Sequence, residues 1–357
     1  MNIGIYLTTA VPPGRQQAEI LDSSLEYARL AEELNYESVW VLEHHFTKYG
    51  ICSSPLVMAG FILGRTSRLK VGTAISILTI EHPVRLAEQA ALLDQLSKGR
   101  FLFGVGRGLF SRDFGVFGGD LRHSRETMRV WLSIIQDAWR QGRCCGTSNL
   151  LKFESVPVYP EPFTVNGPAT YTAAMSPATV EWAASMGIPM LIQHDVEDEE
   201  KISNLELYRS VTADHGHDPE SIDHSLSVVV GVDNDGAAIR ERARYYLGWW
   251  MEEAQRDTKI MDVIEEQKLA DYDWHYRKWK EAVRKGETAT AVRADKILRL
   301  NPIGTPEECI EKLARTIKAT GISRIICGFE AAGERQDVLK SMELFEHQVR
   351  PYLPRQQ

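Results

Sequence analysis

The chain has 357 residues, of which 43% are hydrophobic and 25% charged, an ordinary globular composition. This length exceeds one small sandwich and suits one large α/β barrel of ~250 residues with insertions. The net charge of −8 disfavours a nucleic-acid partner, because phosphate binding needs a basic face, and no run approaches the ~18 apolar residues of a membrane span.

The five cysteines and the N-terminus indicate the compartment. Neither a CxxC pair nor zinc-site spacing occurs among Cys52, Cys144, Cys145, Cys309 and Cys327. Met1 leads directly into an apolar stretch without the basic region of a secretory signal. We therefore expect a cytoplasmic protein with free thiols, no membrane association and no metal.

Short β-branched segments alternate along the chain with longer segments of helical period. The expected strands are 3–7, 38–42, 70–78, 101–105, 170–174, 189–192, 226–232 and 324–328. The expected helices are 18–34, 54–64, 84–97, 124–141, 177–186, 202–215, 237–253, 306–319 and 336–345. Eight strands alternating with helices predict a parallel sheet. The length favours a (β/α)8 TIM barrel that forms one domain over residues 1–357, with an open doubly wound sheet as the alternative.

Two segments interrupt the alternation. Residues 144–167 are rich in proline and short apolar runs, which predicts a hairpin insertion after the fourth unit. Residues 259–294 are charged with interleaved aromatic residues and precede the last βα unit. Long insertions of this kind are functional or disordered, so we interpret this segment as a mobile lid, with a solvated surface excursion as the alternative.

Adjacent histidines follow the second expected strand, on the face where TIM barrels carry their active sites. Side chains of successive strand residues point in opposite directions, so one of His44 and His45 can face the barrel mouth. Histidine titrates near neutrality and is the usual general acid or base. Ordinary polar loop residues are the alternative interpretation.

Residues for a phosphate site follow the fourth and fifth expected strands. Arg107 lies among the glycines at 104, 106 and 108, and Arg125 begins the next helix. Ser176 and Thr179 stand at a helix start, where free N–H groups and the helix dipole favour an anion. These residues could together bind a monophosphate, although a tight turn with solvated arginines and an ordinary helix cap would give the same pattern.

At these residues the chain resembles the bacterial luciferases, and their α subunit in particular. The resemblance runs essentially from end to end and includes VWVLEHHFTKYG (39–50), VGTA (71–74), EHPVRLAEQAALLDQLSKGRF (81–101), GRGL (106–109), RDFGVFG (112–118), EWAASMGIPM (181–190), LNPIGTPEECI (300–310) and CGFEAAG (327–333). The intact 259–294 segment resembles the α-subunit lid, which is largely missing from the β subunit.

The resemblance implies a monooxygenase that uses O₂ and non-covalent reduced FMN, supplied by a separate flavin reductase. Through a flavin C4a-hydroperoxide it would oxidise a long-chain aliphatic aldehyde to the fatty acid with light emission. A β-type subunit would complete a heterodimer, and self-association to a homodimer is the alternative. The apolar helix at 84–97 suits the dimer contact.

The resemblance also implies roles for single residues. His44 would be the catalytic base, and His194 and Trp250 would line the aldehyde pocket. Asp113 would influence flavin handling, Lys285 would act in the lid, and His45 and Glu88 would lie near the subunit interface. The FMN site would comprise Ala74, Ile75, Gly106, Arg107, Arg125, Met175, Ser176 and Thr179, with a cis peptide expected at Ala74-Ile75.

Three positions depart from the luciferase pattern. Gly106 replaces a reactive cysteine, Ile75 replaces a smaller alanine, and His194 replaces a tryptophan of the aldehyde pocket. These departures leave open a non-luminescent relative that oxidises another carbonyl compound in a biosynthetic pathway.

Overall fold

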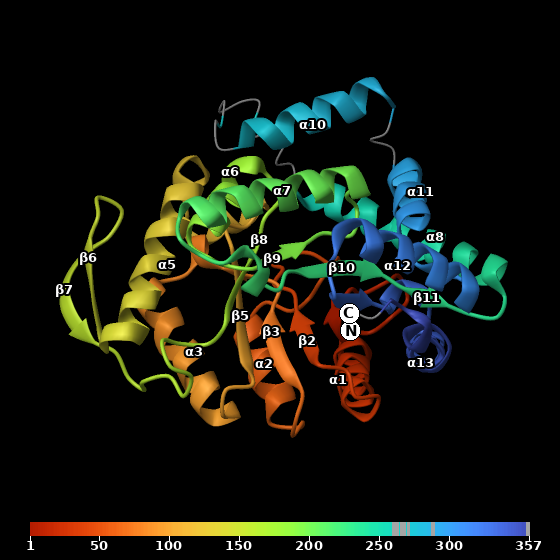
Figure 1. Cartoon of the computed structure of the whole chain (residues 1–357), viewed down its shortest axis with the longest axis horizontal. Helices are drawn as coiled ribbons and strands as arrows, with labels where there is room; N and C mark the ends of the chain where they lie inside the picture. Colours follow the sequence, from red (N-terminus) through yellow and green to blue (C-terminus); the bar gives the residue numbers. More distant parts are fainter. Residues whose placement is uncertain (259–263, 265–268, 270–271, 287–289, 355–357) are drawn as a thin grey trace.

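The computed structural model describes residues 1–354 apart from 259–263, 265–268, 270–271 and 287–289. A parallel barrel lies at its centre and helices surround it (Figure 1). The strands run in the order β3-β2-β1-β13-β10-β9-β8-β5-β4, and pairing of β3 with β5 closes the sheet. Their bounds are β1 Asn2–Leu7, β2 Ser38–Val41, β3 Lys70–Thr73, β4 Ser76–Ile77, β5 Phe101–Gly106, β8 Thr170–Ala173, β9 Met190–Ile192, β10 Ser225–Val229 and β13 Arg324–Gly328. β3 and β4 together occupy one position in the barrel wall, so the nine strands fill eight positions. This closed sheet confirms the TIM barrel and excludes the open sheet.

The helices cover the outside of this barrel. They are α1 Gln17–Glu33, α2 Pro55–Leu63, α3 Pro83–Ser97, α4 Ser111–Phe117, α5 Ser124–Gln141, α6 Pro177–Ser185, α7 Asp198–Asp214, α8 Gly236–Thr258, α10 Asp273–Arg284, α11 Thr290–Leu300, α12 Pro306–Thr320 and α13 Arg335–Leu344. Alternate strand residues such as Ile5 and Val39 are buried against them in one large core cluster. No helix among the described residues is long and apolar enough to cross a membrane.

Aromatic side chains fill the inside of the barrel. Trp40 is fully buried and packs edge-on to Tyr171, with ring centroids 5.1 Å apart. A Cβ at Gly72 would lie 2.4 Å from the Trp40 ring, so only glycine permits this packing. The barrel is therefore a filled core, and its chemistry must lie at its mouth.

The third expected strand is broken in the structure. Residues 70–78 form β3 and β4, and the Ala74-Ile75 peptide between them is cis, as expected. The expected strand 226–232 is likewise divided into β10 and β11 (Gly231–Val232), and β11 pairs with β12 (Ile303–Gly304) outside the barrel sheet. After the first break the chain stays in the barrel sheet as β4, whereas after the second it leaves that sheet.

The predicted hairpin is confirmed. β6 (Arg143–Thr147) and β7 (Lys152–Pro157) pair antiparallel and lie beside α5 at the left of Figure 1. Part of the expected lid, 259–294, lies outside the described residues. Its described helix α10 lies at the top of Figure 1, over α6 and α7. All five cysteines are free, as expected.

Candidate active site

His44 lies just beyond β2 and is enclosed by the loop that follows it. Its ring packs edge-on to Tyr49 and Phe110, with centroids 4.8 and 5.7 Å away. Its Nδ1 atom is buried and has no hydrogen-bond partner in the described part of the chain. Burial lowers the pKa of His44 to about 4, so the imidazole is neutral near pH 7 and can accept a proton.

A backbone network holds the loop around His44. The His44 N–H donates to the Cys52 carbonyl at 3.0 Å, and the Cys52 N–H donates to Thr9 Oγ1 at 3.1 Å. Gly50 lies so close that a Cβ there would be 2.6 Å from His44 Nδ1. The loop position and the ring position therefore depend on each other.

Glu330 supports the same network from the end of β13, and sequence reasoning did not single it out. Its carboxylate accepts the Thr8 N–H at 2.7 Å and the Thr9 N–H at 3.1 Å. Burial raises the pKa of Glu330, while the hydrogen bonds from Thr8 and Thr9 oppose the rise. The signal available in the sequence was its place in CGFEAAG, directly after the last strand.

His45 makes contacts unlike those of His44, as expected for successive residues after a strand. Its Nε2 atom lies 3.0 Å from Glu43 Oε1, and Glu43 Oε2 accepts the Ile77 N–H at 2.9 Å. Burial is the largest single influence on the His45 pKa and lowers it, but the hydrogen bond to Glu43 and the negative charges of Glu43, Asp113 and Glu81 together outweigh burial and raise the pKa. Asp113 is close enough to interact electrostatically with this pair and is 1% exposed, and burial raises its pKa to about 6.

Three of the residues expected to bind phosphate lie at the starts of α5 and α6, and the fourth lies in the loop after β5. Ser176 caps α6, and its Oγ lies 3.0 Å from Thr179 Oγ1, with both residues buried. Arg125 is in the first turn of α5, and Arg129, one turn further on, reaches the Ala178 carbonyl at 3.5 Å. Arg107 follows β5, and its carbonyl accepts the Thr79 hydroxyl at 2.7 Å. We call Arg107, Arg125, Ser176 and Thr179 the phosphate cradle.

Ile75 and Gly106 occupy one space between them. A Cβ at Gly106 would lie 2.6 Å from Ile75 Cδ1 and 2.9 Å from Ile75 Cγ1. The isoleucine side chain thus fills the volume that a side chain at position 106 would need. The two departures from the luciferase pattern at positions 75 and 106 are therefore sterically coupled: the isoleucine fits only because position 106 is a glycine.

Comparisons with known proteins identify the family of the chain. The family model described as luciferase-like monooxygenase matches residues 1–324. The chain belongs to the luciferase-like monooxygenases. The alkanal monooxygenase alpha chain of Photorhabdus luminescens is 40% identical over 357 residues, which cover 100% of this chain and 98% of that one. The alkanal monooxygenase beta chain of Vibrio harveyi is 30% identical over 335 residues, 94% of each chain.

A solved relative gives the same fold. The FMN complex of the oxygenating constituent of 3,6-diketocamphane monooxygenase from Pseudomonas putida has a TM-score of 0.79 to this chain, with 17% sequence identity and 99% of each chain covered. At this identity the likeness establishes the shared barrel architecture.

In this luciferase-like monooxygenase, several buried polar side-chain atoms have no hydrogen-bond partner within the described residues. His194 stacks on Tyr6 with ring centroids 6.3 Å apart, and burial lowers the His194 pKa. Tyr6 OH, Asp195 Oδ1 and Trp250 Nε1 are buried without partners in the described residues. Buried polar atoms of this kind can form hydrogen bonds with a ligand or with water.

Other expected site residues lie farther out. Lys285 follows α10 and pairs with Glu281 at 2.7 Å, with both side chains about half exposed. Glu88 is exposed on α3, and Met175 is partly buried next to Ser176. The roles predicted for these three residues stay predictions.

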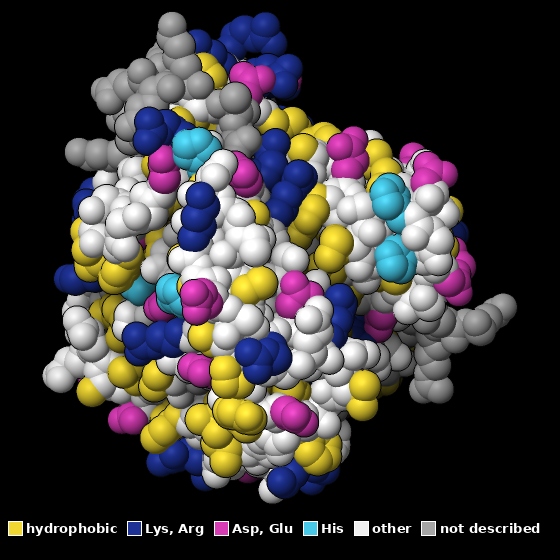
Figure 2. All heavy atoms as spheres, turned by 90° about the vertical axis from the view of Figure 1, so that its left-hand side faces the viewer, with side chains coloured by type: hydrophobic (Ala, Val, Ile, Leu, Met, Phe, Trp, Pro, Cys, Tyr) yellow, Lys and Arg dark blue, Asp and Glu magenta, His cyan; other side chains and the backbone are white. Residues whose placement is uncertain are grey.

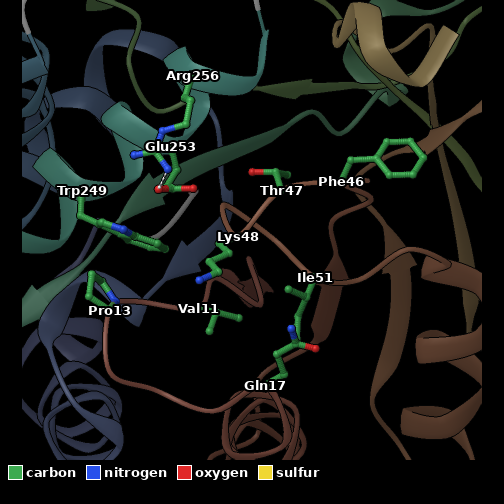
Figure 3. Close-up of a pocket in the computed structure, with 10 residues that line it drawn as sticks. All are labelled: Val11, Pro13, Gln17, Phe46, Thr47, Lys48, Ile51, Trp249, Glu253 and Arg256. Atoms are coloured by element: carbon green, nitrogen blue, oxygen red, sulfur yellow. Dashed lines mark ion pairs between the residues drawn. The ribbon is translucent and has the colours of Figure 1, made fainter. Parts of the chain in front are cut away.

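A separate groove of about 450 Å³ opens beside the mouth (Figure 3). Its walls come from the loop after β1, the loop after β2 and the end of α8, where Glu253 pairs with Arg256 at 2.6 Å. Trp249 and Lys48 point into it. Neither His44 nor the phosphate cradle lines this groove, so it is not the candidate active site.

Proposed function

We propose that the chain is the catalytic, α-type subunit of an alkanal monooxygenase. It oxidises a long-chain aliphatic aldehyde to the fatty acid with O₂ and reduced FMN, and emits light. The observation that carries the proposal is the neutral, buried His44 at the barrel mouth, in a chain 40% identical to an alkanal monooxygenase alpha chain over its whole length.

The cradle fits the phosphate of FMN. Paired hydroxyls at the start of α6 and two arginines match the acceptor oxygens of a phosphate dianion. Ala74, Ile75 and Gly106 are the residues that we propose to lie against the planar ring system of the flavin. Reduced flavin, when bound, supplies the electrons that activate oxygen. In this proposal the flavin is not covalently bound, and a separate flavin reductase supplies it in reduced form.

His44 is the proton acceptor. Its Nδ1 atom faces Gly50, so Nε2 is the nitrogen left to take a proton from the reacting oxygen. The aromatic enclosure by Tyr49 and Phe110 keeps water from the ring. His194 and Trp250 face the aldehyde, and the lid segment, residues 259–294, closes over the mouth during turnover.

A second subunit covers the face formed by α2 and α3. Large hydrophobic side chains are exposed there, including Val57 and Phe61 on α2 and Leu92 and Leu96 on α3. Figure 2 shows hydrophobic side chains gathered toward the lower part of the face that carries α3 and α5. A β-type chain is the proposed partner, because alkanal monooxygenases have alpha and beta chains.

A dark monooxygenase that acts on another carbonyl compound is the second candidate. Two features favour this second candidate. Ile75 together with Gly106 changes the proposed wall beside the flavin ring, and the polar His194 changes the proposed wall of the substrate pocket.

The test mixes the purified chain with photoreduced FMN, O₂ and decanal, with and without a β-type subunit, and measures photons and decanoic acid. We expect light and acid, and His44→Ala should abolish both while the Kd for FMN stays within about twofold. His347→Ala, an exposed histidine far along the chain, is the matched control. Acid without light would support the second candidate, and hydrogen peroxide alone would contradict both.

A further inference from the structure

Tyr272, within the lid segment, contacts the phosphate cradle directly. The Arg107 guanidinium lies over its ring, with Cζ 4.0 Å from the ring centroid. The Tyr272 hydroxyl lies 3.2 Å from Ser124 Oγ and 3.5 Å from the Gly108 carbonyl. One lid side chain thus touches the loop that carries Arg107 and the first residue of α5, next to Arg125.

Tyr272 is held there by an apolar cluster that joins the lid segment to the barrel. Its side chain is 0% exposed. Ile264 and Leu269, also from the lid segment, are buried with Phe114 and Leu121 in the same cluster. The position of the Tyr272 ring is therefore set by docking of the lid segment on α4 and the turn before α5.

Stacking restricts a guanidinium in a way that matters for phosphate binding. The cation is attracted to the face of the tyrosine ring, which restricts where the guanidinium can lie. The N–H donors of a guanidinium lie in its plane, and two of them can bind two phosphate oxygens side by side. A flexible arginine that is already stacked loses less freedom when the anion arrives.

We propose that Tyr272 is a positioning residue that orients Arg107 for the phosphate of the flavin and so links docking of the lid segment to flavin binding. The inference rests on the proposed function, because it needs the cradle to bind FMN. By linkage, whatever favours the Tyr272 contact must strengthen phosphate binding, and phosphate must favour the contact equally.

The experiment compares FMN with riboflavin, which has the same ring system and no phosphate. Kd values for both oxidised flavins are measured by fluorescence with the full chain and its partner subunit. We expect Tyr272→Leu to weaken FMN binding about tenfold and to change riboflavin binding less than twofold. Tyr272→Phe keeps the stacking and loses the Ser124 contact, so its FMN loss should be about two- to threefold.

Two further variants separate positioning from a merely structural effect. In the double variant Arg107→Ala/Tyr272→Leu, FMN binding should be no weaker than with Arg107→Ala alone, because Tyr272 acts through Arg107. Lys278→Ala removes a contact of α10 with Glu200 on α7, 2.9 Å long, and should leave the ratio of the FMN and riboflavin Kd values unchanged.

Equal loss of FMN and riboflavin binding in Tyr272→Leu, or additive losses in the double variant, would overturn the positioning role while leaving the cradle intact. If the parent binds FMN no tighter than riboflavin and Arg107→Ala has no effect, the cradle itself is wrong and the inference is overturned with it. Circular dichroism of each variant establishes that it is folded.

Discussion

At the scale of single residues, Ile75 occupies the space that a side chain at Gly106 would need. Gly106→Cys alone should lower the free energy of unfolding by about 1–3 kcal/mol, because the added Cβ would lie 2.6 Å from Ile75 Cδ1. Ile75→Ala should remove the clash, so the double variant should be more stable than the sum of the two single changes. Urea unfolding of the four proteins in this cycle measures the coupling. Strict additivity would contradict the steric coupling.

His44 shows how far residue-level reasoning from sequence reaches. The strand pattern predicted that His44 and His45 diverge, and their neighbours in the structure differ, with Tyr49 beside one and Glu43 beside the other. The depressed pKa of His44 could not be predicted, because it comes from burial beneath a loop whose approach depends on Gly50. The contact of Tyr272 with Arg107 was not predicted either, because the two residues lie far apart in the sequence.

At the scale of elements, strand and helix positions were predictable where each element keeps one periodicity. α5 and β13 match their expected bounds at both ends. Residues 70–78 were predicted to form one strand, because the cis peptide within them does not change the hydrophobic pattern of the sequence. α4 was not predicted, since its seven residues are too few for helical periodicity to show.

The loops after β1 and β2 act as one element through Thr9. Thr9→Ala should leave the buried Cys52 N–H without its acceptor and cost about 1–3 kcal/mol of stability. Because the Cys52 carbonyl accepts the His44 N–H, acid formation should fall while FMN affinity changes little. Steady-state turnover and FMN titration separate the two effects. Thr9→Ser keeps the hydroxyl and should behave like the parent; if it is as impaired as Thr9→Ala, the hydroxyl is not the connection.

At the scale of the whole molecule, closure of the sheet places every functional loop on one rim. β3 pairs with β5 to close a sheet of parallel strands, so the loops after β2, β5, β8 and β13 meet at the same mouth. Eight alternating units made this arrangement predictable from length and pattern. The residue register with which β3 and β5 close the barrel was not predictable, since the register depends on pairings between strands far apart in the chain.

The partner-binding face is the remaining property of the whole molecule. Leu96 is 71% exposed on α3, and Leu92, one helical turn earlier, is 48% exposed. If a β-type subunit covers this face, Leu96→Glu should weaken association by at least about tenfold, since burying a leucine contributes roughly 1.5–3 kcal/mol and an unpaired buried carboxylate costs more. Sedimentation of the mixed subunits measures the affinity, and light yield at low protein concentration should fall with it. Tyr352→Glu, an exposed aromatic residue near the C-terminus, is the control. Unchanged association of Leu96→Glu together with weakened association of the control would place the partner on the other face.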